Sequence, residues 1–214
     1  MFDHIEHRVI GERNLLVEGP ADLLYLQVVS AMLEKTGRVY LRSDIRIAPT
    51  GGLDKVVTFV ALLGANKLKL VVLHDYRGAP EQKLMDLVRE RMISNKAVLN
   101  PSQFRDPAHF GKNGPPADLE DLFPIATYLE YFNATFAKSL PKPVDNASLP
   151  PGDRIIDRLN RYLEANGIKL RPSGGFNHYL VALEFASKPP AALDDATLGK
   201  FEELFRTVNA LLPV

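Results

Sequence analysis

Short apolar runs that end at a sharp turn and lead into a helical pattern constrain this chain most. The run Asn14 to Val17 is followed by Glu18-Gly19-Pro20, after which apolar residues recur at helical spacing until Thr36-Gly37. Proline at the first position of a helix and glycine just after its last are common signals of helix ends. The junction therefore predicts a buried strand, a turn and a helix, the unit from which parallel α/β sheets are built.

The same order of elements recurs along the first half of the chain. The patterns predict a strand at 46–49, a turn at Thr50-Gly51-Gly52, a helix at 53–63 ended by Gly64-Ala65-Asn66, a strand at 68–73, a helix at 80–92 and a strand at 97–99. The run at 68–73 is the most hydrophobic, as expected of a central parallel strand. We therefore expect an α/β fold with a parallel sheet sandwiched by helices.

The second half reads differently, because no further strand pattern follows. A Gly/Pro-rich loop at 111–117 leads into a predicted helix over 119–137, and four prolines between 141 and 151 then break the chain. Helical patterns follow at 153–166, 176–185 and 197–212. We expect an α/β core at 1–140, a small helical subdomain at 141–186, and at 187–214 a lysine-containing loop with a C-terminal helix that returns to the core.

Composition excludes several classes of protein. The 214 residues contain no cysteine, so thiol catalysis, disulfides and zinc ribbons are excluded, and a cytoplasmic location is expected. Twenty-six basic residues balance 26 acidic ones, so a polyanionic partner would need a local basic face. No apolar run approaches the roughly 20 residues that span a bilayer, and the acidic start is not typical of a signal peptide, so no membrane association is expected.

Acidic residues lie where the predicted strands end. Glu18 leaves the first strand, Asp22 falls in the first turn of the following helix, and Asp75 leaves the third strand. Ligands of open α/β sheets bind at the carboxyl ends of the strands, so these carboxylates are candidates for one site. Without cysteine or clustered histidine, an all-oxygen site suits Mg²⁺ or Mn²⁺. Asp22 alone could instead be a helix-start acid that complements the helix dipole.

These features resemble the Toprim domain, the catalytic core of type IA and II topoisomerases, bacterial primases and several nucleases. More narrowly, they are similar to the OLD (overcoming lysogenization defect) family of nucleases. The motifs that carry the resemblance are the run 16–22, Thr50-Gly51-Gly52, Leu63-Gly64-Ala65, the run 72–75 and Glu120-Asp121-Leu122-Phe123.

The resemblance implies a DNA endonuclease that uses two divalent ions, Mg²⁺ or Mn²⁺. Glu18 and Asp22 would hold one ion, Asp75 would be shared or hold its neighbour, and Glu120 or Asp121 would complete the second site. OLD nucleases also use a lysine near the end of the domain. Lys188 matches that position, where it would neutralise charge on the phosphate.

Two departures from the family pattern qualify what it implies. Toprim domains usually carry Asp-x-Asp after the third strand, whereas here Asp75 is followed by Tyr76 and Arg77, so Arg77 is a candidate DNA contact. OLD proteins join an N-terminal ABC-type ATPase to this nuclease region, but the chain contains no Gly-x-x-x-x-Gly-Lys-Ser/Thr loop. We therefore expect it to be the C-terminal half of a larger ATPase-nuclease.

Simpler interpretations stay open for several of these residues. Glu120 and Asp121 could be first-turn acids of a helix, with Asp118 assisting from the same loop, and Lys188 could be an ordinary surface lysine. His74 is expected to pack on the other face of its strand, and Lys55 to contact DNA.

Three other functions compete with the nuclease. The chief alternative is a Toprim-like module that binds nucleic acid or a protein without cutting. A receiver-like signalling domain and a doubly wound nucleotide binder fit less well, because Glu18-Gly19-Pro20 lacks the paired acids of the first and no Gly-x-Gly-x-x-Gly marks the second.

Overall fold

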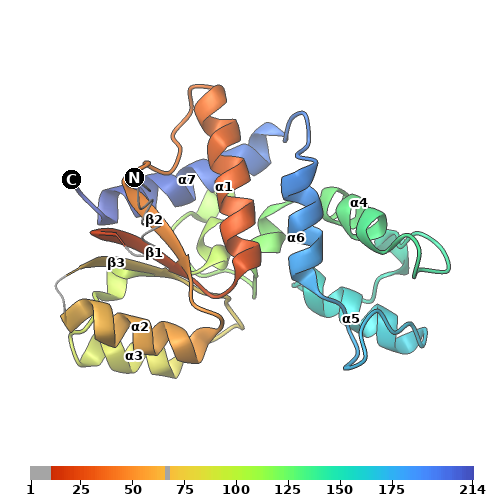
Figure 1. The fold of residues 1–214 in the computed structure, drawn as a ribbon, viewed down its shortest axis with the longest axis horizontal. Coiled ribbons are helices and arrows are strands. Elements are labelled where there is room, and N and C mark those ends of the chain that lie inside the picture. Colours follow the sequence, from red (N-terminus) through yellow and green to blue (C-terminus); the bar gives the residue numbers. More distant parts are fainter. Residues whose placement is uncertain (1–10, 66–67) are drawn as a thin grey trace, which may run out of the picture.

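A parallel sheet of four strands organises the computed structural model, which describes residues 11–65 and 68–214 (Figure 1). The strands are β1 (Arg13–Val17), β2 (Ile45–Pro49), β3 (Lys69–Leu73) and β4 (Val98–Leu99). They lie in the order β2-β1-β3-β4, and each neighbouring pair is parallel. The predicted α/β class with a parallel sheet is confirmed.

Helices cover both faces of this sheet. The α-helices of the described chain are α1 (Pro20–Lys35), α2 (Leu53–Ala65), α3 (Gln82–Arg89), α4 (Ile125–Phe136), α5 (Ile155–Ala165), α6 (His178–Ser187) and α7 (Asp195–Leu211). Figure 1 shows α2 and α3 on one face and α1 and α7 on the other. The chain leaves β1 towards β2 and leaves β3 towards β4, so the crevice of the sheet opens between the ends of β1 and β3.

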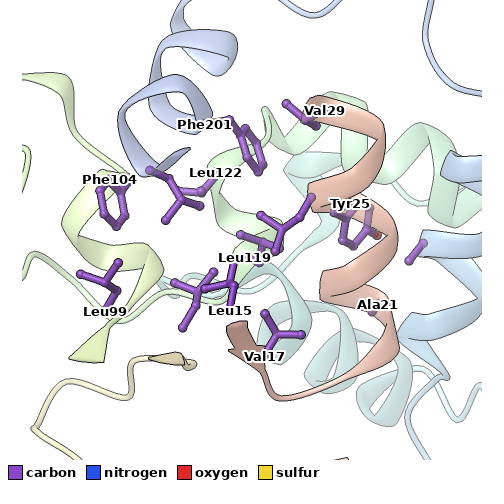
Figure 2. Packing of buried hydrophobic residues seen from close by; sticks show 14 of the residues in the cluster. Leu15, Val17, Ala21, Tyr25, Val29, Leu99, Phe104, Leu119, Leu122 and Phe201 are labelled. Carbon is purple, nitrogen blue, oxygen red and sulfur yellow. The ribbon is translucent and has the colours of Figure 1, made fainter. Parts of the chain in front are cut away.

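One apolar core joins the sheet to segments from distant parts of the sequence. Leu15 of β1 and Tyr25 of α1 are almost fully buried, as are Phe201 of α7 and Leu119, which precedes α4 in the chain (Figure 2). Phe123 adds aromatic contacts, with its ring centroid 5.2 Å from that of Tyr25 and 5.0 Å from that of Phe201. The segment around residues 119–123 is therefore fixed against the first strand and the first helix.

The helix predicted over 119–137 is wrong in one respect, because the chain is interrupted at Pro124. Leu119–Leu122 forms a separate 3₁₀ turn, Phe123 is extended with φ −82° and ψ 154°, and α4 begins at Ile125. Proline disfavours the helical conformation in the residue before it, which explains the break. Glu120 and Asp121 therefore belong to a turn of their own and not to the first turn of α4.

The remaining helices lie to one side of the sheet (Figure 1). There α6 contacts both α1 and α4, while α7 contacts α1. The division at 1–140, 141–186 and 187–214 stays a prediction. The predicted helix stop at Gly64-Ala65-Asn66 reaches beyond the described residues. Among the helices of the described chain, none combines the length and the apolar character needed to cross a membrane.

A turn rich in glycine ties the exits of β1 and β2 together. Thr50 N donates to the Val17 carbonyl at 3.0 Å, and the N–H groups of Gly51 and Gly52 donate to the Glu18 carbonyl at 2.9 and 2.8 Å. Gly51 and Gly52 have φ of 84° and 116°, values that favour glycine. The turn thereby fixes the backbone of Glu18 at the edge of the sheet.

Replacing Gly52 by alanine should strain this turn, while the same change within a helix should not. We expect Gly52→Ala to lower the free energy of unfolding by about 1–3 kcal/mol, because its positive φ is unfavourable for a residue with a Cβ. Gly199→Ala in α7 should be neutral or stabilising by up to about 1 kcal/mol. Urea unfolding of both variants measures the difference, and equal stabilities would contradict a strained turn.

Candidate functional site

Glu18 and Asp75 meet at the carboxyl ends of two neighbouring strands. The parallel register pairs Val17 of β1 with Leu73 of β3, so the residues that follow emerge side by side. Glu18 Oε1 accepts a hydrogen bond from the backbone N–H of Asp75 at 3.1 Å. The structure therefore brings together the acids at the ends of the first and third strands.

Asp22 lies beside them in the first turn of α1. Its Oδ2 accepts a hydrogen bond from Gly19 N at 2.8 Å, which caps the helix start. Burial, followed by the charge of Glu120, raises the pKa of Asp22 to about 7. Asp22 is thus a helix-start acid and at the same time a member of the acidic group.

Two more acids arrive from a distant segment through a short antiparallel bridge. Tyr76 N donates to the Ala117 carbonyl at 2.9 Å, and Ala117 N donates back to the Tyr76 carbonyl at 3.0 Å. This pairing places the 118–121 turn beside the exit of β3. Asp118 and Glu120 are buried there, with 2% and 3% of their surface exposed.

These acids line one hollow of about 490 Å³, which we call the acidic hollow. Its carboxylates are those of Glu18, Asp22, Asp75, Asp118 and Glu120, together with Asp157 from α5. Gly51, Gly52 and Arg77 also line it. The predicted convergence of acids at one edge of the sheet is therefore present in the geometry.

Two basic side chains on the helical segments hold two of the carboxylates. Arg154 donates from Nε to Asp118 Oδ1 at 2.8 Å and from Nη2 to Asp118 Oδ2 at 2.7 Å, a bidentate and buried pair. His178 Nδ1 lies 3.2 Å from Glu120 Oε1. This hydrogen bond raises the pKa of His178, because Glu120 favours the protonated imidazole.

The other carboxylates lack comparable neutralisation. Burial, then the nearby Asp118, raises the pKa of Asp75 well above its usual value. Burial likewise raises the pKa of Glu18, against the effect of the hydrogen bond from Asp75 N. Closely spaced acids that resist ionisation are the donor set that a hard divalent cation would neutralise.

The donor chemistry therefore fits Mg²⁺ or Mn²⁺, although the carboxylates do not converge on one point as the ligands of a bound ion would. Within residues 11–65 and 68–214, no three acidic or histidine side chains stand close enough to form a ready-made metal site. Ligation would require these carboxylates to turn towards a shared ion.

Asp121 faces away from the acidic hollow and serves two backbone groups. Its Oδ2 accepts from Asp118 N at 2.8 Å, and its Oδ1 accepts from Ile155 N at 2.8 Å. Ile155 is the first residue of α5, whose N-cap residue Arg154 provides no side-chain cap. Asp121 therefore caps α5 from another part of the chain, and burial raises its pKa to about 7.

Of the three basic residues predicted to act at the site, only one lines the acidic hollow. Arg77 lines the acidic hollow, is 66% exposed, and has its Nη2 3.9 Å from Asp75 Oδ2. Lys55 is exposed on α2, with its side chain over Gly51 and outside the lining of the hollow. Lys188 lies at the C-terminal end of α6, where its Nζ contacts Glu184 Oε1 at 2.8 Å. A helix of this length places it about 15 Å from His178, which is at the hollow.

Sequence reasoning did not find Arg154 or His178, and it left Asp118 undecided. No short motif marks these residues, because each reaches the hollow through contacts that join distant parts of the sequence. The one available signal was the pair Glu120-Asp121, which pointed to the right segment.

Comparison with known families agrees with the resemblance drawn from the motifs. Residues 11–76 match the family model described as Overcoming lysogenization defect protein-like, TOPRIM domain. The match includes Glu18, Asp22 and Asp75 and ends at Tyr76, and the parallel α/β sheet is consistent with a Toprim-like fold. Toprim domains typically bind divalent metals and are associated with nuclease and primase activity. Neither a search of curated proteins nor a search of solved structures found a match.

The raised pKa values predict that the metal-free protein loses stability as pH rises. A carboxyl of the unfolded chain titrates near 4, whereas Asp22 and Asp121 titrate at about 7 in the fold. Between these values the folded state binds more protons, so the free energy of unfolding falls with pH. We expect it to be roughly 2–5 kcal/mol higher at pH 5 than at pH 8 in EDTA. Urea unfolding at intervals of pH measures this, with Asp22→Asn expected to flatten the curve. A stability that rises towards pH 8 would contradict it.

The capping role of Asp121 predicts a loss of stability on truncation. Asp121→Ala should lower the free energy of unfolding by about 1–3 kcal/mol, because two buried N–H groups lose their acceptor. Asp121→Asn should lose less, since its amide retains one acceptor oxygen. Glu130→Ala, an exposed change on α4, is the matched control and should stay within about 0.5 kcal/mol. Chemical denaturation compares the three, and a harmless Asp121→Ala would rule out the cap.

Proposed function

We propose that this chain, whose residues 11–76 match the OLD-like Toprim domain, is a divalent-metal-dependent DNA endonuclease. The observation that carries the proposal is the convergence of six carboxylates on one hollow, five of them near the exits of β1 and β3 and the sixth, Asp157, on α5. We further propose that the chain is the C-terminal half of a larger ATPase-nuclease, as in OLD proteins.

The acidic hollow offers donors for two ions. Glu18, Asp22 and Asp75 would hold one ion or share it with the second, and Glu120 would complete the second site. Bound divalent ions supply an activated water and stabilise the negative charge of a phosphodiester during hydrolysis. We assign Glu120 rather than Asp121 to the second ion, because both oxygens of Asp121 accept backbone N–H groups.

The chain's own cations would bind and orient the phosphate. Arg77 is exposed at the hollow next to Asp75, so its guanidinium is available to a phosphate oxygen. Arg154 is already bound to Asp118 on both oxygens and therefore positions that carboxylate. Lys188 is given no part in this step, because it lies at the far end of α6 and pairs with Glu184.

A module that binds nucleic acid without cutting is the second candidate. Arg77 favours it, because this basic residue stands where Toprim domains usually carry the second acid of Asp-x-Asp. The two functions differ in whether a metal-dependent cut occurs, since both predict DNA binding.

Cleavage of supercoiled plasmid tests the nuclease directly. We expect nicking or linearisation with Mg²⁺ or Mn²⁺, none in EDTA, and a loss of roughly 100-fold or more in Glu18→Gln, which removes the charge of a proposed ligand. The matched control is Glu12→Gln, since the Glu12 side chain is 88% exposed at the other end of β1. Glu12→Gln should cut as the parent does.

Metal binding is measured separately by thermal unfolding. An ion at ten times its dissociation constant should raise the free energy of unfolding by about 1.4 kcal/mol, and Glu18→Gln should show less of this gain. Metal stabilisation and DNA retention without cleavage would establish the non-cutting module. If Glu18→Gln cuts DNA at the full rate, the acidic hollow is not the active site.

A further inference from the structure

We infer that a trough along α5 holds the phosphate backbone of the DNA strand on which the acidic hollow acts. This inference rests on the proposed function and adds to it where the strand lies and which residues bind it. The trough consists of two further hollows of about 430 and 580 Å³ that adjoin the acidic hollow, and we call the two together the α5 trough.

Shared walls make the trough and the acidic hollow continuous. Asn160 of α5 lines all three. Arg77 and Arg154 line both the smaller hollow and the acidic one, while Arg171 and Phe176 line both the larger hollow and the acidic one. An extended ligand that reaches the acids can therefore continue into a hollow on either side.

The lining of the α5 trough is mainly basic, whereas the acidic hollow that adjoins both of its parts is rich in carboxylates. Its two hollows are lined by five basic side chains, Arg77, Arg154, Arg161, Lys169 and Arg171, and by three acidic ones, Asp153, Asp157 and Glu164. A positive margin beside a negative centre is what a phosphate backbone requires when one phosphate must enter an acidic, metal-binding site.

The charge of Arg161 and Arg171 is available to a ligand. Arg161 is exposed and donates to the carbonyls of Pro151 and Asp157, and exposed Arg171 donates to Ser173 Oγ. These acceptors are neutral, and in the described chain no carboxylate forms an ion pair with either guanidinium. Each can form charge-assisted hydrogen bonds to phosphate without giving up an ion pair.

Asn160 supplies an independent sign of a ligand at the junction. Its Oδ1 is buried and accepts no hydrogen bond from any described residue. The chain approaches this amide at Gly175, where a Cβ would lie 2.6 Å from Oδ1. A buried acceptor without a donor is unfavourable, so water or a ligand N–H group is expected there, and the amino groups of nucleobases are donors of this kind.

Fluorescence anisotropy with a short labelled DNA duplex tests the trough. Binding is measured in a Glu18→Gln background with Mg²⁺, so that the DNA stays intact. Arg161→Gln and Arg171→Gln should each weaken binding about 3- to 10-fold and reduce the slope of log Kd against log salt by about 0.9, the value for one lost phosphate contact. Asn160→Ala should weaken binding without changing the slope, because it removes no charge.

Arg46→Gln is the control, because Arg46 is exposed near the amino end of β2, away from the strand exits. It should change neither affinity nor slope. Thermal unfolding of every variant checks that the fold is retained. Unchanged affinity and slope in both Arg161→Gln and Arg171→Gln would overturn the trough even if the parent chain cuts DNA, as would a parent that binds no DNA. If the slopes of log Kd against log salt fall in these variants but the parent chain cuts no DNA, the result would support the trough and contradict the nuclease function.

Discussion

The candidate site depends on the contacts that attach the start of α5 to the 118–121 turn. Arg154 holds both oxygens of Asp118, and Asp121 accepts the first N–H of α5. Asp118 is buried, so removing Arg154 would leave its charge without this partner, at a cost of about 3–5 kcal/mol. The same contacts place α5 and its trough next to the exits of β1 and β3. Stability and site geometry are therefore linked through one turn.

The same contacts also decide which carboxylates of the site have a basic partner. Arg154 pairs with Asp118 and His178 with Glu120, yet burial raises the pKa of Asp118, and burial with mutual repulsion raises the pKa values of Glu18, Asp22 and Asp75. A fold that buries like charges in this way is destabilised at neutral pH unless a cation binds. In the proposed function the negative centre and the basic walls of the trough would act together, because the first would attract metal and the second the phosphates that the metal binds.

The sequence was sufficient for what local patterns determine. Apolar runs ending in Glu18-Gly19-Pro20 and in Asp75 predicted the strands, and parallel pairing then required the two acids to emerge together. The sequence could not predict which of Asp118 and Asp121 faces the hollow. That is decided by the bridge between Tyr76 and Ala117 and by the break at Pro124. Sequence spacing could not indicate the partner of Asp118, which lies 36 residues away on another element.

Arg77 changes what the Toprim motif can do in this chain. An acid at this position would add a ligand to the metal centre, whereas a guanidinium two residues after Asp75 lies on the same side of the extended chain and offers hydrogen bonds to phosphate. In the proposed function, the second ion would then rely on Glu120, which pairs with His178, because Arg154 holds both oxygens of Asp118. Under this proposal, the exchange of one acid for one base would make the helical segments part of the metal site and would tie metal binding to the elements that form the trough.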